Sequence, residues 1–437
     1  MTDSPGQVSF GVAARFWLKL GFISFGGPAG QIAIMHEELV VRRRWLSEER
    51  FLHALNYCMV LPGPEAQQLA TYIGWLMHRT AGGLVAGGFF VLPSLVLLIV
   101  LSWLYARFGS TALIAGIFYG LKPAVTAIVA HAAWRIGRRT LHAGWLWVVA
   151  LTAFLALLAG GIPFPAVILA AALVGWFGTR FAPAQFQAAR PPAHQTGPAD
   201  LAPPPDSLPH TRFAWPRFLL VLATGIGLWV LPMAGLTFLG GWNGTLTQMG
   251  WFFTKAALVT FGGAYAVLPY VYQGAVVHYG WLTAPQMMDG LALGETTPGP
   301  LIMVVAFVGF LGGYGQSLAG SDPSVLGGVL AALVATWFTF LPSFVFILAG
   351  GPLVESGRGA PHLAAPLAGI TAAVVGAILS LGLRLAQHAV WKDGPDWVAI
   401  GIAAAALVAL IRFRRSVVEV IGAAALLGLL ASYSFVG

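Results

Sequence analysis

One block of sequence occurs twice in this chain, and it interrupts apolar segments at the same places each time. The first copy holds Lys19, Phe25-Gly26-Gly27, Trp45-Leu46 and Pro62-Gly63-Pro64. The second copy holds Lys255, Phe261-Gly262-Gly263, Trp281-Leu282 and Pro298-Gly299-Pro300. Each pair is separated by 236 positions, so no residue is inserted or lost inside the block. Glycine and proline breaks at matching places in two halves are typical of secondary transporters with discontinuous helices.

The composition indicates a membrane protein. The 437 residues are 58% hydrophobic and only 9% charged, whereas soluble domains carry roughly 25% charged residues. Apolar runs such as 84–105 and 325–350 are long enough to span ~30 Å of hydrocarbon as helices. We therefore predict an all-α polytopic membrane protein with two inverted-topology repeats and discontinuous or re-entrant helices. The start of the chain shows no removable signal pattern, and the single cysteine, Cys58, excludes an internal disulfide.

The repeat extends through most of the chain. We expect broken segments at 10–39 and 48–78, spans at 84–106, 111–134, 144–160 and 162–181, and their copies at 246–278, 284–314, 325–350, 363–388, 396–411 and 416–435. Leu92-Pro93-Ser94 recurs as Leu341-Pro342-Ser343, now 249 positions apart. The predicted units are a first repeat (1–182), a flexible Pro- and Ala-rich linker (183–212), a connecting span (213–240) and an inverted second repeat (241–437).

Arginine clusters bear on the topology of the broken segments. If these segments are re-entrant hairpins, Arg42-Arg43-Arg44 falls on the same side as the Arg135, Arg138 and Arg139 cluster. If each segment crosses the membrane once, the two clusters face opposite sides. Basic residues concentrate on the cytoplasmic side of membranes, so we favour hairpins. This bias also explains the net charge of +8 without nucleic acid.

The breaks themselves predict a binding site for an anion. Unpaired backbone groups within a membrane are tolerated only where they line a cavity or are buried in protein. The N-terminus of a half-helix carries free N–H groups and about half a positive charge, which favours anions. The second arms begin just after Gly27, Gly63, Gly263 and Gly299, and four such ends would form an anion pocket. Alternatively, these residues only kink packed helices.

Charged and polar residues near the breaks are further candidates. Lys19 and Lys255 are repeat equivalents among four lysines, and a cation there would attract an anion or extend to the membrane surface. Glu65 and Glu295 flank the Pro-Gly-Pro breaks as proton carriers, counter-ions or helix caps. Neutral hydrogen-bonding candidates are Ser24, Asn56, Gln67, Gln68, Thr260, Thr296 and Thr297. Arg135 and Arg384 are interpreted as interfacial anchors.

Several classes of chemistry have no support in the sequence. His36-Glu37 lacks the second histidine of a metalloprotease helix, because Val40 stands in its place. No lysine follows a glycine, so there is no phosphate-binding loop for ATP. A G-x-S-x-G nucleophile motif is also missing. We expect no metal, no cofactor and no catalytic residue.

Together, Phe25-Gly26-Gly27-Pro28, His36-Glu37, the Arg-Arg-Trp ending at Trp45 and Pro62-Gly63-Pro64 resemble the chromate ion transporter family. The weaker second copy, which has Ala264 after Gly263 and Tyr272-Gln273 in place of His36-Glu37, resembles its long, fused form. The resemblance implies export of chromate across the inner membrane and chromate resistance. Sulfate is a look-alike with the same tetrahedral, doubly negative shape.

We therefore predict a secondary transporter for a small oxyanion, with a site formed by Lys19, Lys255 and the break residues Ser24, Gly26, Gly27, Pro62, Gly63, Pro64, Glu65, Gln68, Thr260, Gly262, Gly263, Glu295, Thr296, Thr297, Pro298, Gly299 and Pro300. The expected partners are the anion and the lipid bilayer, with a homodimer left open and nucleic acid excluded. An intramembrane enzyme acting on a lipid-linked or phosphorylated substrate is the alternative, and a membrane scaffold is a third reading.

Overall fold

The computed structural model describes residues 8–25, 27–159, 162–181, 210–315, 323–356, 364–391 and 394–434. Within these ranges the chain is helical, with one isolated bridge between Trp391 and Pro395. Six helices are long and apolar enough to cross a membrane. The structure thus confirms an all-α polytopic membrane protein. Most of the predicted linker lies outside the described residues, and the unit boundaries stay predictions.

The helices of the first half follow the predicted order. They are α1 (Phe10–Ile23), α2 (Gly27–His36) with a π-helical turn at Glu37–Arg42, α3 (Glu48–Val60), α4 (Glu65–Phe108), α5 (Ala112–Thr140), α6 (Gly144–Leu158) and α7 (Phe164–Phe181). Both breaks are present, because α1 ends before Ser24 and α3 ends before Leu61.

The second half repeats this order after a connecting helix. Its helices are α9 (Trp215–Gly240), α10 (Thr245–Val259), α11 (Ala264–Tyr272) with a π-helical turn at Gln273–His278, α12 (Ala284–Thr296), a 3-10 turn (Leu301–Met303), α13 (Val304–Gly315), α14 (Val325–Ser356), α15 (Ala364–Val390), α16 (Trp397–Ile411) and α17 (Val417–Ser434). The π-helical turns after α2 and α11 are repeat equivalents.

Helix α4 has 44 residues, which is too long for one membrane crossing, and it folds back on itself. His78 and Arg79 leave the helical region of backbone space, and Arg79 adopts a φ of +55°. On either side of this turn the two arms touch closely: a Cβ on Gly74 would lie 2.4 Å from the carbonyl oxygen of Gly82. Residues 65–77 therefore form the second arm of a broken segment, and residues 80–108 form the crossing helix.

Aromatic contacts show that the first broken segment of each half is a hairpin. The rings of Phe16 in α1 and Trp45 after α2 are 5.1 Å apart. Their repeat equivalents, Phe252 and Trp281, are 5.5 Å apart. A segment that ran straight through a membrane would hold these rings far apart, since α1 alone rises about 20 Å. The loop after the second arm thus returns to the first arm in both copies.

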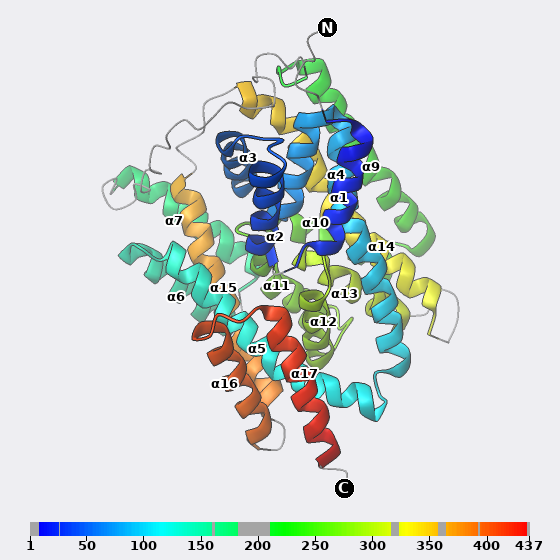
Figure 1. Ribbon diagram of the computed structural model, residues 1–437, viewed down its shortest axis with the longest axis vertical. Helices are drawn as coiled ribbons and strands as arrows, with labels where there is room; N and C mark the ends of the chain where they lie inside the picture. The colour runs from blue at the N-terminus through cyan, green and yellow to red at the C-terminus, as the bar shows by residue number, and fades with distance from the viewer. Residues whose placement is uncertain are drawn as a thin grey trace.

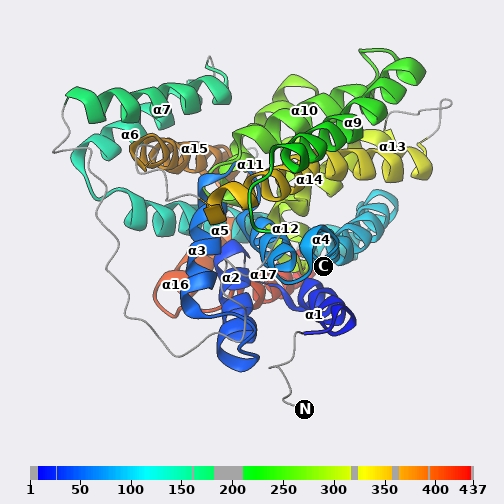
Figure 2. The ribbon, with the colours of Figure 1, turned by 90° about the horizontal axis from the view of Figure 1, so that it is seen from above.

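The two halves run in opposite directions and exchange helices. In Figure 1, the crossing part of α4 descends from the end that holds the N-terminus, whereas α14 ascends towards that end. Helices α6 and α7 pack against α15 of the second half, and α16 and α17 pack against α5 of the first. Viewed from above, α6, α7 and α15 form one flank of the molecule (Figure 2).

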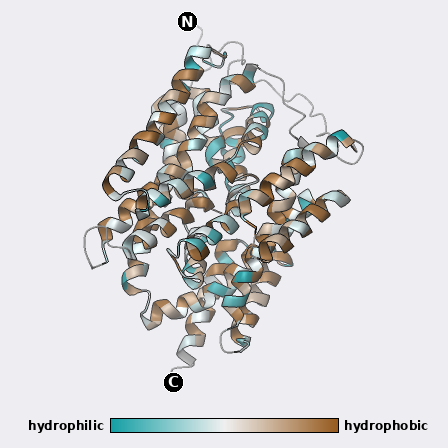
Figure 3. Ribbon diagram, turned by 180° about the vertical axis from the view of Figure 1, so that it is seen from behind, coloured by the Kyte–Doolittle hydropathy of each residue, from teal (hydrophilic) through white to brown (hydrophobic). Residues whose placement is uncertain are grey.

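Small residues allow these helices to approach closely. A Cβ on Gly120 of α5 would lie 1.9 Å from the carbonyl oxygen of Ala424 in α17. A Cβ on Gly376 of α15 would lie 2.1 Å from that of Ala150 in α6. Close backbone packing is a main source of helix association in membranes, where burial of apolar side chains offers little drive. The outer helices are predominantly hydrophobic (Figure 3), and Phe238 of α9 is 91% exposed.

Candidate functional site

The four breaks meet at the centre of the molecule and are joined across the repeats. The amide of Gly63 donates a hydrogen bond to the Thr260 carbonyl oxygen at 2.7 Å. The amide of Gly299 donates to the Ser24 carbonyl oxygen at 2.8 Å. Ser24 is the repeat equivalent of Thr260, and Gly63 is that of Gly299, so the two bonds are one contact made twice. Each Pro-Gly-Pro break is thereby tied to the Gly-Gly break of the other half.

Only glycine fits at these junctions. Gly63 has a φ of +131° and Gly299 a φ of +99°, a region that other residues rarely adopt. A Cβ on Gly63 would lie 2.4 Å from Ser343 Oγ, and one on Gly299 would lie 2.7 Å from Ser94 Cβ. Ser94 and Ser343 are themselves repeat equivalents. Each Pro-Gly-Pro break therefore lies against the Leu-Pro-Ser of the other half. The side-chain contacts at the junction thus occur twice, as the backbone hydrogen bonds do.

The helices that begin at the breaks have uncapped N-termini. No side chain caps α4 at Pro64, α11 at Gly263 or the turn after Pro300. By contrast, Ser47 caps α3, and its repeat equivalent Thr283 forms a capping box with Gln286 in α12. Free N–H groups at a helix start need acceptors. At the outer ends of the protein water supplies them, whereas at the centre the acceptor must come from the protein or a bound ligand.

Two carboxylates lie among these helix ends. A Cβ on Gly263 would lie 3.7 Å from Glu65 Oε1 and 3.9 Å from Pro28 Cγ, which places Glu65 at the start of α11. Glu295, which is 7% exposed, accepts a hydrogen bond of 2.6 Å from the Tyr265 hydroxyl. Glu65, the first residue of α4, thus lies where helix dipoles favour negative charge, whereas Glu295 lies in the last turn of α12.

One arginine provides positive charge at the same place. Arg135 of α5 is half-buried and lies close enough to Glu295 and Tyr265 to interact with both electrostatically. Its repeat equivalent, Arg384, instead donates hydrogen bonds to the Leu157 and Leu158 carbonyl oxygens at 2.9 and 3.0 Å, at the end of α6. The interpretation of both arginines as interfacial anchors did not anticipate this difference.

Several buried polar atoms at the junction have no hydrogen-bond partner. They are the Oγ atoms of Ser24 and Ser94 and the Oε1 atoms of Gln31, Gln67 and Gln68. All five residues are at most 1% exposed. All three amides are held by their nitrogens: Gln31 donates to the Gly299 carbonyl oxygen at 2.5 Å, Gln67 to the Thr71 hydroxyl at 2.9 Å and Gln68 to the Pro62 carbonyl oxygen at 2.8 Å. Buried groups are normally paired, so the unpaired serine hydroxyls are available to a polar ligand.

The structure brings only part of the predicted set together. Gln68 and the glycines and prolines of the breaks are central, as are Ser24, Thr260, Glu65 and Glu295. The hydroxyls of Thr260, Thr296 and Thr297 donate to carbonyl oxygens of the preceding turn. Gly26 lies outside the described residues. Lys19 is exposed on α1, and Lys255 is half-buried with its Nζ 5.6 Å from the Trp251 ring centroid.

Sequence reasoning missed several residues of the junction. Gln31 and Tyr265 stand in no motif, and nothing in the sequence singles them out. Ser94 and Ser343 were recognised as part of the repeat, although not as neighbours of the breaks. Their recurrence beside a proline in two apolar spans is the signal that identifies them.

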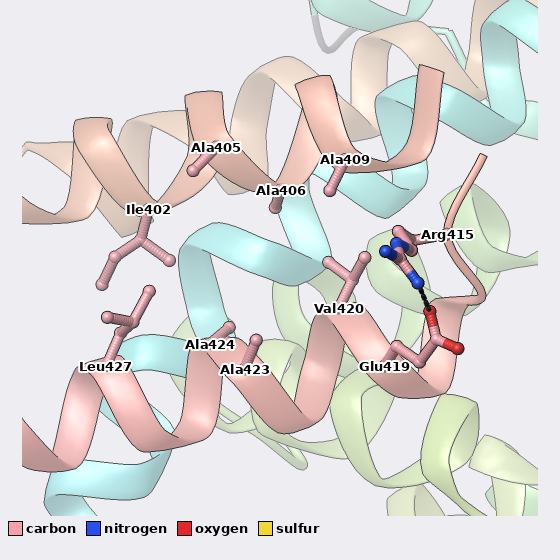
Figure 4. Close-up of a pocket in the computed structure, with 10 residues that line it drawn as sticks. All are labelled: Ile402, Ala405, Ala406, Ala409, Arg415, Glu419, Val420, Ala423, Ala424 and Leu427. Atoms are coloured by element: carbon pink, nitrogen blue, oxygen red, sulfur yellow. Dashed lines mark ion pairs between the residues drawn. The ribbon is translucent and has the colours of Figure 1, made fainter. Parts of the chain in front are cut away.

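Three cavities lie away from the junction, and no residue of the four breaks lines any of them. The first lies between α16 and α17 beside the ion pair of Arg415 and Glu419 (Figure 4). The second, of about 1170 Å³, is apolar and lies between α4, α9 and α14. The third cavity lies between α5, α6 and α15. We place the site at the junction because the unpaired polar groups and helix ends are there.

Oppositely oriented repeats with broken helices that meet at the centre define a multi-pass membrane transporter. The chromate transporter family model matches the chain twice, over residues 12–176 and 247–429, and the protein belongs to this family. It is a multi-pass protein of the inner membrane and has the long, two-repeat form.

Relatives from three bacteria match nearly the whole chain. It is 36% identical to a chromate transport protein of Pseudomonas aeruginosa, covering 95% of this chain and 90% of the relative. It is 30% identical to a chromate transport protein of Cupriavidus metallidurans, covering 95% and 92%. A probable chromate transport protein of Synechococcus elongatus is 29% identical, covering 89% and 87%. No solved structure matches the fold.

Proposed function

We propose that this protein exports chromate, a small tetrahedral oxyanion, from the cell through the junction of the four breaks. The observation that carries the proposal is the reciprocal contact in which Gly63 binds Thr260 and Gly299 binds Ser24 across the repeats. It gathers uncapped helix ends and unpaired serine hydroxyls within a protein interior. These groups suit an oxyanion, which accepts hydrogen bonds on all sides. The names of the relatives support chromate as the substrate, and sulfate has the same shape and charge.

The membrane potential favours this direction of transport. Moving one charge through 100 mV is worth about 2.3 kcal/mol, so a dianion leaving an inside-negative cell gains about 4.6 kcal/mol. That energy sustains a gradient of more than about a thousandfold. Export therefore needs neither ATP nor a catalytic residue.

Both cross-repeat hydrogen bonds are present in this conformation, which fits a state between inward and outward opening. Because each cross-repeat bond joins one half to the other, rocking one repeat against the other would break one bond while its equivalent persisted. The site would then be accessible from alternate sides in turn. The carboxyl group of Glu65, at the start of α11, lies close to the free helix end that the anion would approach.

The test is transport by the purified protein in liposomes. An imposed inside-negative potential should drive chromate out of the vesicles, and flux should rise with the potential. Excess sulfate should compete with chromate for transport, whereas excess chloride in a phosphate-free buffer should not. Protein-free vesicles provide the control. Vesicles that contain folded protein and move no chromate under any potential would refute the proposal.

A matched pair of variants locates the site. Ser94→Ala and Ser343→Ala remove one hydroxyl each at the junction and leave backbone packing intact. Each should raise the chromate concentration needed for half-maximal flux about tenfold or more, because a hydrogen bond to a charged group contributes about 1.5–3 kcal/mol. Ser110→Ala, in the turn between α4 and α5, is the control. If all three variants have the same affinity for chromate, the anion binds elsewhere.

A further inference from the structure

A second buried charge cluster lies outside the junction, between the two halves. Asp289 of α12 is 3% exposed and accepts a hydrogen bond of 2.8 Å from the Tyr105 hydroxyl of α4. Lys122 Nζ of α5 lies 3.6 Å from the same oxygen, Asp289 Oδ2. The other oxygen, Oδ1, is buried without a hydrogen-bond partner. A carboxyl group is thus held inside the membrane domain with one of its two oxygens lacking a hydrogen-bond partner.

Holding up the fold does not account for this cluster, because the symmetry-equivalent place between the halves lacks it. The equivalent of Asp289 in the first repeat is His53, which is exposed on α3. The equivalent of Lys122 in the second repeat is Thr371, whose hydroxyl donates to the Leu367 carbonyl oxygen at 2.8 Å. At this equivalent place the same helices form with an exposed histidine and a threonine, without a buried carboxyl group or a lysine. Buried ion pairs rarely add net stability, and ionisable groups inside membranes most often mark ion or proton pathways.

The position of Asp289 connects it with the central site. Asp289 and Glu295 lie on the same helix, six residues apart, which is about 9 Å along the axis. Helix α12 is also the first arm of the Pro-Gly-Pro break at Gly299. Any movement that opens this break shifts α12 against α4 and α5, which hold Tyr105 and Lys122. The cluster is therefore placed to respond to the same motion as the junction.

We propose that Asp289, with Tyr105 and Lys122, is a proton-binding site that couples proton movement to anion transport. This inference rests on the proposed function. The proton binds at Asp289 Oδ1, the unpaired oxygen, and is released from it unchanged, so no other reactant is needed. Within the described part of the chain, Tyr105 and Lys122 are the charged or titratable groups that act on Asp289; α13, α15 and α17, which also pack against α12, contribute none.

Electrostatics sets the direction of coupling. When Asp289 takes up a proton, its negative charge disappears while Lys122 keeps its positive charge. The interior then carries one additional positive charge, which strengthens binding of a dianion nearby. By linkage, a bound anion strengthens binding of the proton to the same extent. Proton and anion therefore move together in the same direction. A chromate dianion with one proton still carries one negative charge, so the membrane potential still contributes to export, by half of its contribution to export of the dianion alone.

The experiment uses full-length protein in liposomes with the potential clamped at zero by equal potassium and valinomycin. With about pH 8.5 inside and about pH 7.5 outside, one-to-one coupling should concentrate chromate about tenfold in the lumen. Asp289→Asn mimics the protonated acid and should lose this accumulation while potential-driven chromate flux remains. Protein-free vesicles correct for passive entry. Asp396→Asn is the matched control, because Asp396 also accepts a tyrosine hydrogen bond, from Tyr119, but caps the start of α16.

Each outcome decides the question. Potential-driven flux without any pH-driven accumulation in the unmodified protein would overturn the coupling site and leave the transport function standing. Absence of all chromate flux would instead refute the transport function. Accumulation that persists in Asp289→Asn, or that follows a sodium gradient instead of the pH gradient, would also overturn the proposal.

A second variant tests the proposal if Asp289→Asn does not fold. Tyr105→Phe removes the hydrogen bond to the carboxylate and keeps the acid. Protonation should then occur at lower proton concentration, so coupled uptake should persist to a more alkaline pH than in the unmodified protein. An unchanged pH profile in this variant would count against the cluster.

Discussion

At the scale of single residues, the most demanding positions are the glycines of the two Pro-Gly-Pro breaks. Each adopts a positive φ, faces a serine of the other half and donates its amide across the repeat. The sequence identifies these glycines through their recurrence alone. Their contact partners could not be predicted, because Ser94 and Ser343 follow the breaks by about 30 and 45 residues in a different helix, and pairing across halves depends on how the repeats are inverted.

Replacing these glycines should therefore disrupt the junction. Gly63→Ala and Gly299→Ala each force a Cβ into contact with a serine and strain the backbone by about 1–3 kcal/mol. We expect lower thermal stability in detergent and loss of chromate flux. Gly235→Ala in α9, where a Cβ meets nothing within 4 Å, is the control and should behave as the unmodified protein. Adding Ser94→Gly to Gly299→Ala should restore part of the lost stability. If it restores none, the contact with Ser94 is not the cause of the loss.

The two repeated lysines remain candidates for attracting the anion, and their surroundings rank them. Lys255 is half-buried beside Trp251, whereas Lys19 is exposed. A cation acts more strongly on an anion where water is excluded. We expect Lys255→Met to lower chromate flux several-fold, and Lys19→Met to lower it less. Chromate flux measured at several salt concentrations checks this ranking, because salt screens an exposed charge more and should reduce the effect of Lys19→Met more than that of Lys255→Met. Full transport by both variants would remove the lysines from the site.

At the scale of elements, the broken segments are hairpins whose arms are held together by aromatic rings. The prediction of hairpins from arginine positions depended on charge alone, and the contact of Phe16 with Trp45, repeated by Phe252 with Trp281, supplies the physical reason. The prediction of a separate span at 84–106 did not foresee that it would continue from the preceding arm through a sharp turn. His78 and Arg79 carry no glycine or proline signal, so tertiary packing decides that turn.

The aromatic contacts should contribute unequally to stability. Trp281 is 7% exposed and stacks on Tyr279 at 4.5 Å, whereas Trp45 is half-buried. Removal of a buried large aromatic side chain costs about 3–5 kcal/mol. We expect Trp281→Ala to lower the melting temperature in detergent clearly more than Trp45→Ala, with Trp147→Ala on the outer face of α6 as the control. Equal losses for Trp281 and Trp45 would show that the two hairpins are closed by other contacts.

At the scale of the whole molecule, the repeats are interlocked instead of standing side by side. Helices α6 and α7 pack on α15, and α16 and α17 pack on α5, so each half completes the other. Both break junctions also bridge the halves. A single repeat would leave these surfaces and its uncapped helix ends exposed to lipid, which offers no hydrogen bonds.

Neither half should therefore be stable alone. If the chain is cut between residues 181 and 210 and the fragments are co-expressed, they should co-purify through a tag on one of them and transport chromate. Each fragment expressed alone should be degraded or aggregate. Membrane levels of the tagged fragment with and without its partner measure the difference. Stable accumulation of the first half by itself would contradict an interlocked architecture.

The amino-acid sequence alone determined the class of this protein, its two copies and the places where its helices break, because apolar length and glycine or proline interruptions act locally. It also marked the break residues that meet at the centre of the molecule. Packing in three dimensions establishes which break meets which, that Arg135 and Tyr265 join the acids at the centre, and that Asp289 pairs with Lys122. These contacts join residues far apart in the chain. Their geometry arises from the inverted packing of two repeats, which no local pattern encodes.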